Sequence, residues 1–411
     1  MSGKKWILAA ALVILGLALI TRLPAVQSGL EWRLDRAKGI VRGWIYPGET
    51  IPVPEFVSDP GQDQALSQTA VPTGTPTQQE VPEQALSPTP SPTPLPESVI
   101  LPEPEWEKQD WNNCGPASLS MALRYYGWAG DQFDISDYNK PERSDKNVSI
   151  TELIYYVKNF AGWLDADYRV GGNIELLRGF IAAGYPVIIE ASNEILEGGG
   201  GWAAHYLLVT GYDETGRMIF VQNSYLRHEN TLTYEELEEH WKPFNYMYLF
   251  IYPPEELERI NQLLGDDQDF EQNRTRALEI AEEQISQDSE DAFAWFNKGT
   301  NLAALERYEE AAQSYDSAFK LGLPWRYMRY QFGPYLAYFH SGRFEDVIEV
   351  AELTLQRTPN SEEALLWHGW ASYQLGDVNT AVEDFYQAYE LNPSYADARY
   401  ALEYLGLLDQ D

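Results

Sequence analysis

Cysteine is almost lacking, and the common metal and nucleotide motifs are absent. Cys114 is the single cysteine among 411 residues, which excludes an internal disulfide and any zinc site built from C-x-x-C pairs. The sequence also lacks the H-E-x-x-H motif of zinc peptidases and the G-x-x-x-x-G-K-[ST] loop that binds nucleotide phosphates. We therefore expect neither a metal nor another cofactor.

Positive charge is scarce as well. Lys and Arg number 29 against 63 Asp and Glu, so the formal net charge is −34. Proteins bind nucleic acids by placing Lys and Arg against phosphates. This composition excludes nucleic acid as a partner.

Long hydrophobic runs are absent except at the N-terminus. Residues 6–20 are apolar and uncharged and follow Lys4 and Lys5. A run of this length fits the core of a signal peptide and is short for a membrane span, which needs about 17–25 residues. Residues 1–28 are thus predicted to be an uncleaved signal-anchor or a cleaved signal peptide. Both alternatives place the rest of the chain outside the cytoplasm, and we favour the single-pass membrane anchor.

The rest of the chain divides by composition into three parts. Residues 29–104 are predicted to be a juxtamembrane segment followed by a stalk rich in Pro, Thr and Ser, which cannot build a core. Residues 105–254 have the mixed pattern of a globular domain. Residues 268–411 are predicted to be helical.

Cys114 is predicted to lie at the start of a helix. Pro116 suits the first turn of a helix, where its missing N–H costs nothing. Apolar residues then recur at helical spacing: Leu119, Leu123 and Tyr126. A thiol at a helix N-terminus lies near unpaired N–H groups and the positive end of the dipole, so we expect a lowered pKa and a reactive nucleophile. The alternative is a small buried cysteine used only for packing.

A thiolate nucleophile needs a base within hydrogen-bond reach. His205 opens an alternating apolar and aromatic run, 204–213, that predicts a strand, and a flexible glycine run at 198–201 precedes it. We infer that His205 is the base, and the alternative is a half-buried strand histidine. The other histidines lie in the repeat region or in polar segments that we interpret as surface: His340, His368, His228 and His240.

The turn after this strand places a third polar residue beside His205. With Gly216 in the left-handed conformation, the turn is a three-residue loop with a bulge, and the next strand spans 217–224. This register sets Leu207 opposite Asn223, which then shares the face of His205 at about 7–8 Å between backbones. A two-residue turn would instead move Asn223 to the other face. Asn223 is therefore predicted to orient the imidazole, and the alternative is a turn residue that ends the strand.

The run Q-x-x-x-N-C-G-P-A-S-L and the later H-Y-x-x-V-x-G-Y-D run resemble the family thirty-nine cysteine peptidases. These are papain-like enzymes whose best-known members remove double-glycine leaders from bacteriocins. The resemblance covers roughly residues 100–252. It implies that Cys114 attacks a carbonyl, that His205 is the base, that Asn223 orients it, and that an upstream glutamine, Gln109, helps to bind the oxyanion.

Three departures from the family pattern limit what is carried over. Gln109 lies five residues before the cysteine rather than six, and Lys108 occupies the sixth position. Asn223 stands where Asp is commoner, and an amide cannot stabilise imidazolium by charge. The leader-removing members are fused to exporters with an ATP-binding cassette and act in the cytoplasm. Because this chain has no nucleotide motif, the double-glycine substrate is not expected.

The remaining pattern of the middle part predicts an α+β papain-like domain, with the nucleophile on a helix and the base on an antiparallel sheet. The predicted helices are 151–160, 174–183 and 234–241, and the further predicted strands are 186–190 and 246–252.

The C-terminal part repeats with a period of 34 residues. Gly342 recurs at Gly376, and Pro359 at Pro393. This is the tetratricopeptide period. We expect an all-α solenoid of three repeats with a helix on either side: 292–325, 326–359 and 360–393, with 270–287 before and 394–405 after. Such arrays bind peptides or proteins, and the acidic composition favours basic partners. The alternative is an unrelated helical bundle.

The sequence thus predicts an outward-facing cysteine peptidase, membrane-anchored or secreted. Its substrate is a peptide or protein, and the repeats bind a protein partner. Two alternatives stay open. A non-catalytic scaffold with the same fold would only bind peptide, and an amidase, deconjugase or transpeptidase would use the same triad on another bond, because one triad serves all acyl transfers.

Overall fold

The structure is a computed structural model that describes residues 50–54, 94–141, 147–192, 202–225 and 227–409. The hydrophobic residues 6–20 and most of the predicted stalk lie outside this part. Among the described residues, no helix is both long enough and apolar enough to cross a membrane.

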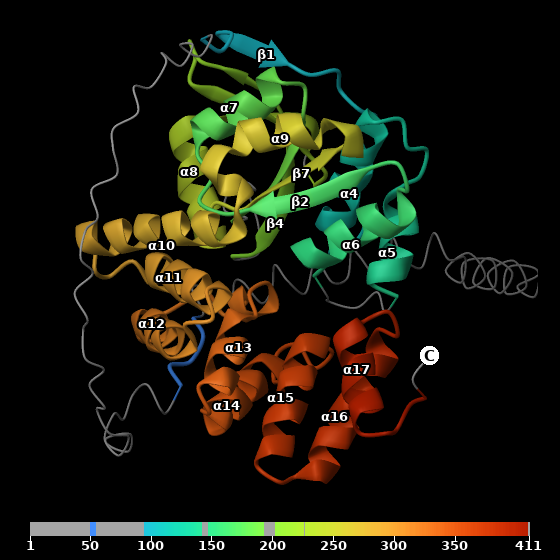
Figure 1. The fold of residues 1–411 in the computed structure, drawn as a ribbon, viewed down its shortest axis with the longest axis vertical. Helices are drawn as coiled ribbons and strands as arrows, with labels where there is room; N and C mark the ends of the chain where they lie inside the picture. Colours follow the sequence, from blue (N-terminus) through green and yellow to red (C-terminus); the bar gives the residue numbers. More distant parts are fainter. Residues whose placement is uncertain (1–49, 55–93, 142–146, 193–201, 226, 410–411) are drawn as a thin grey trace, which may run out of the picture.

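An antiparallel sheet forms the centre of the N-terminal half (Figure 1). Its strands follow the order β2-β7-β3-β4-β5-β6, while β1 pairs with the second half of β4. Their bounds are β1 Ser98–Ile100, β2 Asp165–Arg169, β3 Val187–Ser192, β4 Ala204–Asp213, β5 Met218–Asn223, β6 Arg227–Thr233 and β7 Tyr248–Tyr252. Residues 98–100, predicted as part of the stalk, therefore belong to the sheet.

Each face of this sheet has its own core, because alternate strand residues point to opposite faces. On β3, Ile188 packs with helices α4, α5 and α6, whereas Ile189 packs with α7, α8 and α9. These helices are α4 Cys114–Tyr125, α5 Gln132–Asn139, α6 Ile150–Phe160, α7 Ile174–Ala182, α8 Tyr234–Trp241 and α9 Leu257–Leu264. Short 3₁₀ turns are η2 Lys242–Phe244, η3 Pro254–Glu256 and η4 Gly265–Gln268. The predicted α+β papain-like class is confirmed, while α5, β1, β2 and β6 were not predicted.

Paired helices form the C-terminal half, as the 34-residue period predicts. The elements are α10 Phe270–Gln287, α11 Ala292–Ala304, α12 Tyr308–Leu321, η5 Tyr327–Arg329, α13 Gly333–His340, α14 Phe344–Leu355, α15 Glu362–Gln374, α16 Val378–Leu391 and α17 Ala396–Tyr404. The recurring glycines have a structural reason. Gly342 (φ 77°) and Gly376 (φ 91°) follow the first helix of a pair in a left-handed conformation, which glycine adopts without strain. We call residues 270–404 the array.

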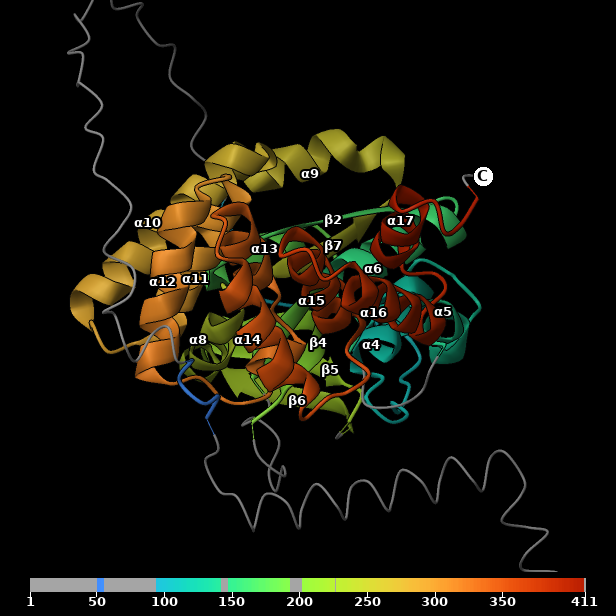
Figure 2. The same cartoon turned by 90° about the horizontal axis from the view of Figure 1, so that it is seen from below.

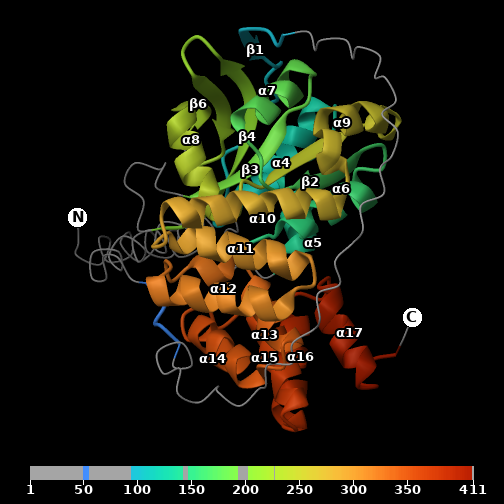
Figure 3. The same cartoon turned by 60° about the vertical axis from the view of Figure 1, so that its left-hand side comes forward.

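The array packs directly against the catalytic half, with α10 and α11 closest to the sheet (Figure 3). Trp202, which lies just before β4, stacks on Phe244 of η2 and on Phe293 of α11, with ring centroids 5.8 and 6.2 Å away. Tyr327 joins the same group, 5.3 Å from Trp202. An aromatic cluster thus joins the array to the start of the strand that carries His205.

Buried polar contacts reinforce this junction. Asn273 of α10 accepts the Val170 N–H at 3.2 Å and donates to the Val170 carbonyl at 2.9 Å. Asn245 and Asn301 exchange two hydrogen bonds of 2.7 and 3.3 Å. Ala277 of α10 belongs to the same buried cluster as Cys114. The first array helix therefore completes the core on the nucleophile's side of the sheet.

The far end of the array returns to the catalytic half near α5, as the view from below shows (Figure 2). Asn392, after α16, donates to the Asn139 carbonyl at the end of α5 (3.2 Å). The array is therefore attached at both of its ends.

A short upstream segment also lies on the array. Ile51 donates to the Leu323 carbonyl at 2.7 Å, and Thr50 forms a bridge with Pro324. Ile51 is buried in the array core. This segment falls in the region predicted as juxtamembrane residues and stalk, and residues 50 and 51 contact the array there.

Candidate active site

Cys114 is the first residue of α4, as the sequence predicts. Asn113 precedes it, and no side chain caps this end of the helix. Residues 114–123 of the helix are buried, because α4 packs along β4, where Gly115 lies against the Tyr206 ring. The nucleophile candidate is only 6% exposed.

The thiol is protonated in this environment. Burial raises the pKa of Cys114 to about 11, and the carboxylate of Glu190 acts in the same direction. A hydrogen bond from the Tyr206 N–H and the ammonium of Lys140 lower this pKa, but less than burial raises it. The expectation of a lowered thiol pKa is therefore wrong, because loss of water outweighs the helix terminus.

His205 is the second residue of β4 and is 4% exposed. Burial lowers its pKa to about 4, although the hydrogen bond with Asn223 acts in the other direction. The Tyr206 N–H that binds the thiol belongs to the peptide group directly after His205. The two candidates therefore lie at the same end of β4. In the part of the chain that the structure describes, they share no hydrogen bond with each other.

Asn223 ends β5 and lies beside His205. Its Oδ1 is 2.9 Å from Nε2 of His205 and also accepts the backbone N–H of Tyr225 at 2.9 Å. A backbone N–H can only donate, so this second bond identifies the atom as the amide oxygen. Nε2 of His205 must then carry the proton, which leaves Nδ1 as the basic nitrogen.

The hairpin turn differs from the predicted one. The left-handed residue is Arg217 (φ 50°) and not Gly216. Asp213 pairs with Met218, and this register alone would place Asn223 on the face opposite His205.

A bulge on β4 restores the predicted face. The register shifts by one residue between Val209 and Gly211, so that Val209 pairs with Val221. The extra residue compensates for the longer turn. Asn223 and His205 therefore share a face, as predicted, although the path between them is different.

Gln109 is held beside the same strand end. Its backbone N–H donates to the Ser224 carbonyl at 2.9 Å, and the Ser224 hydroxyl donates to Gln109 Oε1 at 2.9 Å. With its oxygen bound in this way, the amide turns Nε2 away from Ser224. Nε2 is then the donor end of the Gln109 side chain.

Gln132 was not singled out in the sequence, yet it organises the segment before the nucleophile. Its Oε1 accepts from the Asp110 N–H at 2.7 Å and from Asn113 Nδ2 at 2.9 Å. Its Nε2 donates to the Lys108 carbonyl at 2.8 Å and to Glu107 Oε1 at 2.9 Å. No motif marks this residue, because it acts through backbone groups and not through a fixed spacing.

Lys140 is a second residue that the sequence did not reveal. It is 3% exposed, and its ammonium donates to the carbonyls of Trp111 (2.9 Å) and Asn112 (3.1 Å). Asn112 has a left-handed backbone (φ 47°), which Asn tolerates better than most residues. A buried cation thus holds the loop that leads into the nucleophile.

Two of the other histidines have partners of their own. His240 is half buried, and its Nδ1 lies 2.7 Å from the Ser192 hydroxyl. His368 pairs with Asp384 within the array. Among the described residues, no group of His, Cys, Asp and Glu is placed to hold a metal ion.

Comparisons with known proteins match two parts of the chain. The model of the Peptidase C39 like family matches residues 104–248, and the tetratricopeptide repeat model matches 294–321 and 362–395. These are the first and third predicted repeats, and the middle one departs from the family pattern, as its sequence shows. Comparison with curated proteins gave no match.

Similar solved structures cover either half of the chain. Xylellain, a cysteine protease from Xylella fastidiosa, is 14% identical, with a TM-score of 0.32, and covers 39% of this chain and 87% of its own. The peptidase domain of Streptococcus ComA is 14% identical, with a TM-score of 0.29, and the match covers 38% of this chain and 98% of that domain. The tetratricopeptide protein YrrB, which has an unusual peptide-binding site, is 19% identical, with a TM-score of 0.29. The match covers 37% of this chain and 77% of YrrB.

Residues 104–248 thus match the Peptidase C39 like family, which supports a cysteine peptidase, and the C-terminal part carries matches to tetratricopeptide repeats. The first supports a peptidase role and the second a protein-binding role.

Proposed function

We propose that this peptidase cleaves peptide bonds with a Cys114, His205 and Asn223 triad and with Gln109 as an oxyanion donor. The hydrogen bond between His205 and Asn223 carries the proposal. Because the Tyr225 N–H fixes the amide orientation, Nδ1 of His205 is the nitrogen that lacks a proton. That nitrogen can accept the thiol proton.

The reaction then follows the acyl-transfer scheme. Cys114 Sγ forms a bond to the scissile carbonyl carbon as its proton passes to His205 Nδ1. The carbonyl oxygen becomes an oxyanion, which Gln109 Nε2 and the Cys114 N–H stabilise. Collapse breaks the C–N bond, and the leaving amine takes the proton from His205. Water then hydrolyses the thioester with His205 acting as base.

The resting pair is neutral, and this shapes the mechanism. A thiol with a pKa of about 11 and an imidazole with a pKa of about 4 do not form an ion pair at neutral pH. Proton transfer must therefore accompany substrate binding. Hydrogen bonds at such sites often tighten only in the substrate complex, which fits the absence of a direct bond between the two residues here.

Two other functions could be built on the same site. A scaffold without catalysis needs no oriented imidazole, so the Asn223 contact favours the enzyme. A transpeptidase or amidase would use the same residues and would differ only in the acceptor or in the bond broken.

The experiment is a peptide-library cleavage profile of the full chain, with intact-mass analysis of the products. Hydrolysis gives products that gain one water in total, and transpeptidation gives ligated peptides. Cys114→Ala and His205→Ala should each abolish turnover, and Asn223→Ala should reduce it. Turnover that survives Cys114→Ala would overturn the proposal.

We further propose that the array recruits a protein partner or substrate, and that basic partners are preferred because the chain is acidic. The catalytic domain is assigned to 105–254 together with the preceding residues that form β1, and the repeats to 268–411. Residues 1–28 are proposed to anchor or export the chain, with both halves outside the cytoplasm.

A further inference from the structure

Gln132 is a buried amide with all of its hydrogen-bonding capacity in use. It is 3% exposed and begins α5. Its oxygen accepts two hydrogen bonds and its NH₂ group donates two. Backbone partners on both sides fix which atom is oxygen, because the Asp110 N–H only donates and the Lys108 carbonyl only accepts.

Those two backbone partners flank Gln109. The Lys108 carbonyl belongs to the peptide group before Gln109, and the Asp110 N–H belongs to the one after it. Gln132 thus bridges both peptide groups of Gln109, at 2.8 and 2.7 Å. On the other side, Ser224 binds the N–H and the side-chain oxygen of Gln109, at 2.9 Å each. Gln109 is held from two directions.

The same amide reaches the start of the nucleophile helix. Gln132 Oε1 also accepts from the side chain of Asn113, the residue directly before Cys114. One buried side chain therefore sets the spacing between the two proposed oxyanion donors, Gln109 Nε2 and the Cys114 N–H. This matters here because Gln109 lies one residue closer to the cysteine than the family spacing.

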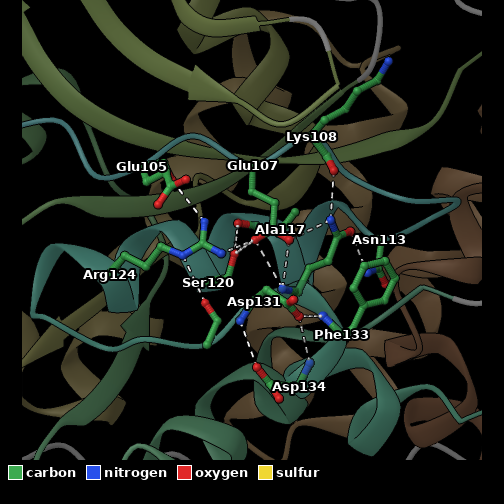
Figure 4. Close-up of polar contacts among 12 residues, drawn as sticks. Glu105, Glu107, Lys108, Asn113, Ala117, Ser120, Arg124, Asp131, Phe133 and Asp134 are labelled. Carbon is green, nitrogen blue, oxygen red and sulfur yellow. Dashed lines mark hydrogen bonds and ion pairs between the residues drawn. The ribbon is translucent and has the colours of Figure 1, made fainter.

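Glu107 connects this clamp to α4. Its carboxylate accepts from the Ser120 hydroxyl at 2.6 Å and from the Gln132 N–H at 3.1 and 3.2 Å, and it pairs with Arg124 at 3.0 Å (Figure 4). Ser120 and Arg124 lie on α4, about two and three turns beyond the nucleophile. The segment before Cys114, α4 and α5 are thereby fixed relative to each other.

We propose that Gln132 is a positioning residue for the oxyanion donor Gln109, held against Ser224 on the opposite side. The proposal rests on the proposed peptidase function, because it assigns Gln109 to the oxyanion. Gln132 itself does not touch the substrate. It acts by fixing the two peptide groups on either side of Gln109.

The first test is Gln132→Met, which keeps the volume and removes all four hydrogen bonds. We expect kcat on the best fluorogenic peptide of the library to fall about 10- to 100-fold with KM nearly unchanged, because an oxyanion donor acts in the transition state. Alkylation of Cys114 by iodoacetamide needs no oxyanion donor and should change less than about twofold. In the Gln109→Ala background, Gln132→Met should lower kcat little further, since both substitutions remove the same interaction with the oxyanion.

Hydrogen exchange tests the clamp without turnover. In Gln132→Met the amide of Asp110 should exchange about tenfold faster or more, whereas that of Gln109, bound to Ser224, should stay protected. The matched control is Gln222→Met, because Gln222 is equally buried and donates to the Pro104 carbonyl, away from Gln109. It should change neither kcat nor the exchange of Asp110.

Two results would overturn the proposal. One is an unchanged rate of hydrogen exchange at the Asp110 amide in Gln132→Met. The other is the behaviour of a purely structural residue, in which the loss of kcat adds fully to that of Gln109→Ala or the iodoacetamide rate falls by the same factor. Failure of the peptidase function is a separate result. It would appear as turnover that is indifferent to Cys114→Ala, whatever Gln132→Met does.

Discussion

The side-chain oxygen of Asn223 lies 2.9 Å from Nε2 of His205, and the Tyr225 N–H binds the same oxygen. This relationship sets the tautomer of the buried imidazole from a backbone group. Among the described residues, the partner that orients the ring is a neutral amide, unlike a site in which Asp occupies this position.

Replacing Asn223 separates orientation from charge. Asn223→Ala should lower kcat about 10- to 100-fold, because His205 loses the partner that fixes its tautomer. Asn223→Asp should raise the pKa of His205 from about 4 towards neutrality, since a carboxylate stabilises imidazolium. An NMR titration of His205 measures this shift directly. A His205 pKa that is the same in both variants would show that Asn223 is not its partner in solution.

Burial of Cys114 predicts slow labelling of the free enzyme. Because burial raises the thiol pKa to about 11, the rate of iodoacetamide labelling should be low at pH 7 and rise steadily to pH 10. A peptide chloromethyl ketone occupies the substrate site and should react much faster at pH 7 than iodoacetamide does. His205→Ala should remove that advantage. Rapid iodoacetamide labelling near pH 6 would instead indicate a thiolate at rest.

Glu190 makes stability depend on pH. Glu190 lies on β3, opposite Tyr206 of β4. Burial raises the pKa of its carboxyl group to about 8, although the Tyr206 side chain acts in the other direction. Because the carboxyl pKa is higher in the folded protein (about 8) than in the unfolded chain (about 4.5), the protonated carboxyl group favours the folded state. This contribution to the free energy of unfolding is full below pH 4.5 and is lost as the pH rises through 8. Glu190→Gln should therefore raise the free energy of unfolding by on the order of 2–4 kcal/mol at pH 8–9, with little change at pH 4.

Denaturant unfolding at the two pH values checks this prediction. Glu214→Gln is a suitable comparison because its side chain is about 40% exposed and paired with Arg178. It should show at most a small effect, in keeping with a surface ion pair. An equal rise in the free energy of unfolding of Glu190→Gln at both pH values would show that ionisation of Glu190 does not lower stability.

The array junction predicts that the catalytic half depends on its first helices. Removing residues 268–411 exposes the ring of Trp202 and takes Ala277 out of the core that contains Cys114. We expect this truncation to lose turnover of a small peptide as well as stability. Removing only 357–411 keeps α10 and α11 and should spare small-peptide turnover. Full activity of the longer truncation would show that the array only recruits.

A point substitution tests the same junction in the full chain. Trp202→Ala should cost about 2–4 kcal/mol in the free energy of unfolding, because it removes a half-buried aromatic side chain that packs on Phe244, Phe293 and Tyr327. Tyr400→Ala, which removes a largely exposed array ring, is the matched control and should cost much less. Thermal unfolding of the two variants gives the comparison, and equal losses would exclude a special role for the junction.

Much of the site could be predicted because it depends on local pattern. The helix start at Cys114 and the strand of His205 follow from spacing and turn chemistry. The face of Asn223 was also predicted, but only because a longer turn at Arg217 and a bulge near Gly211 cancel. A bulge is set by packing across strands, which single-strand patterns do not contain.

The electrostatics of the site could not be predicted in the same way. The helix terminus indicates a lowered thiol pKa, whereas burial by distant segments raises it. Lys140 and Gln132 act on backbone groups far from them in sequence, so no motif points to them. The junction around Trp202 is likewise a product of tertiary packing.

The contact of residues 50–54 with the array changes how the chain carries force. The upstream end of the Pro-rich stretch is fixed at Ile51 on the array, and its downstream end leads to β1, which pairs with β4. Any tension from the N-terminus is therefore borne first by the bridge between Thr50 and Pro324. As long as the Thr50–Pro324 bridge is intact, a force applied at the N-terminus reaches the catalytic sheet through the array.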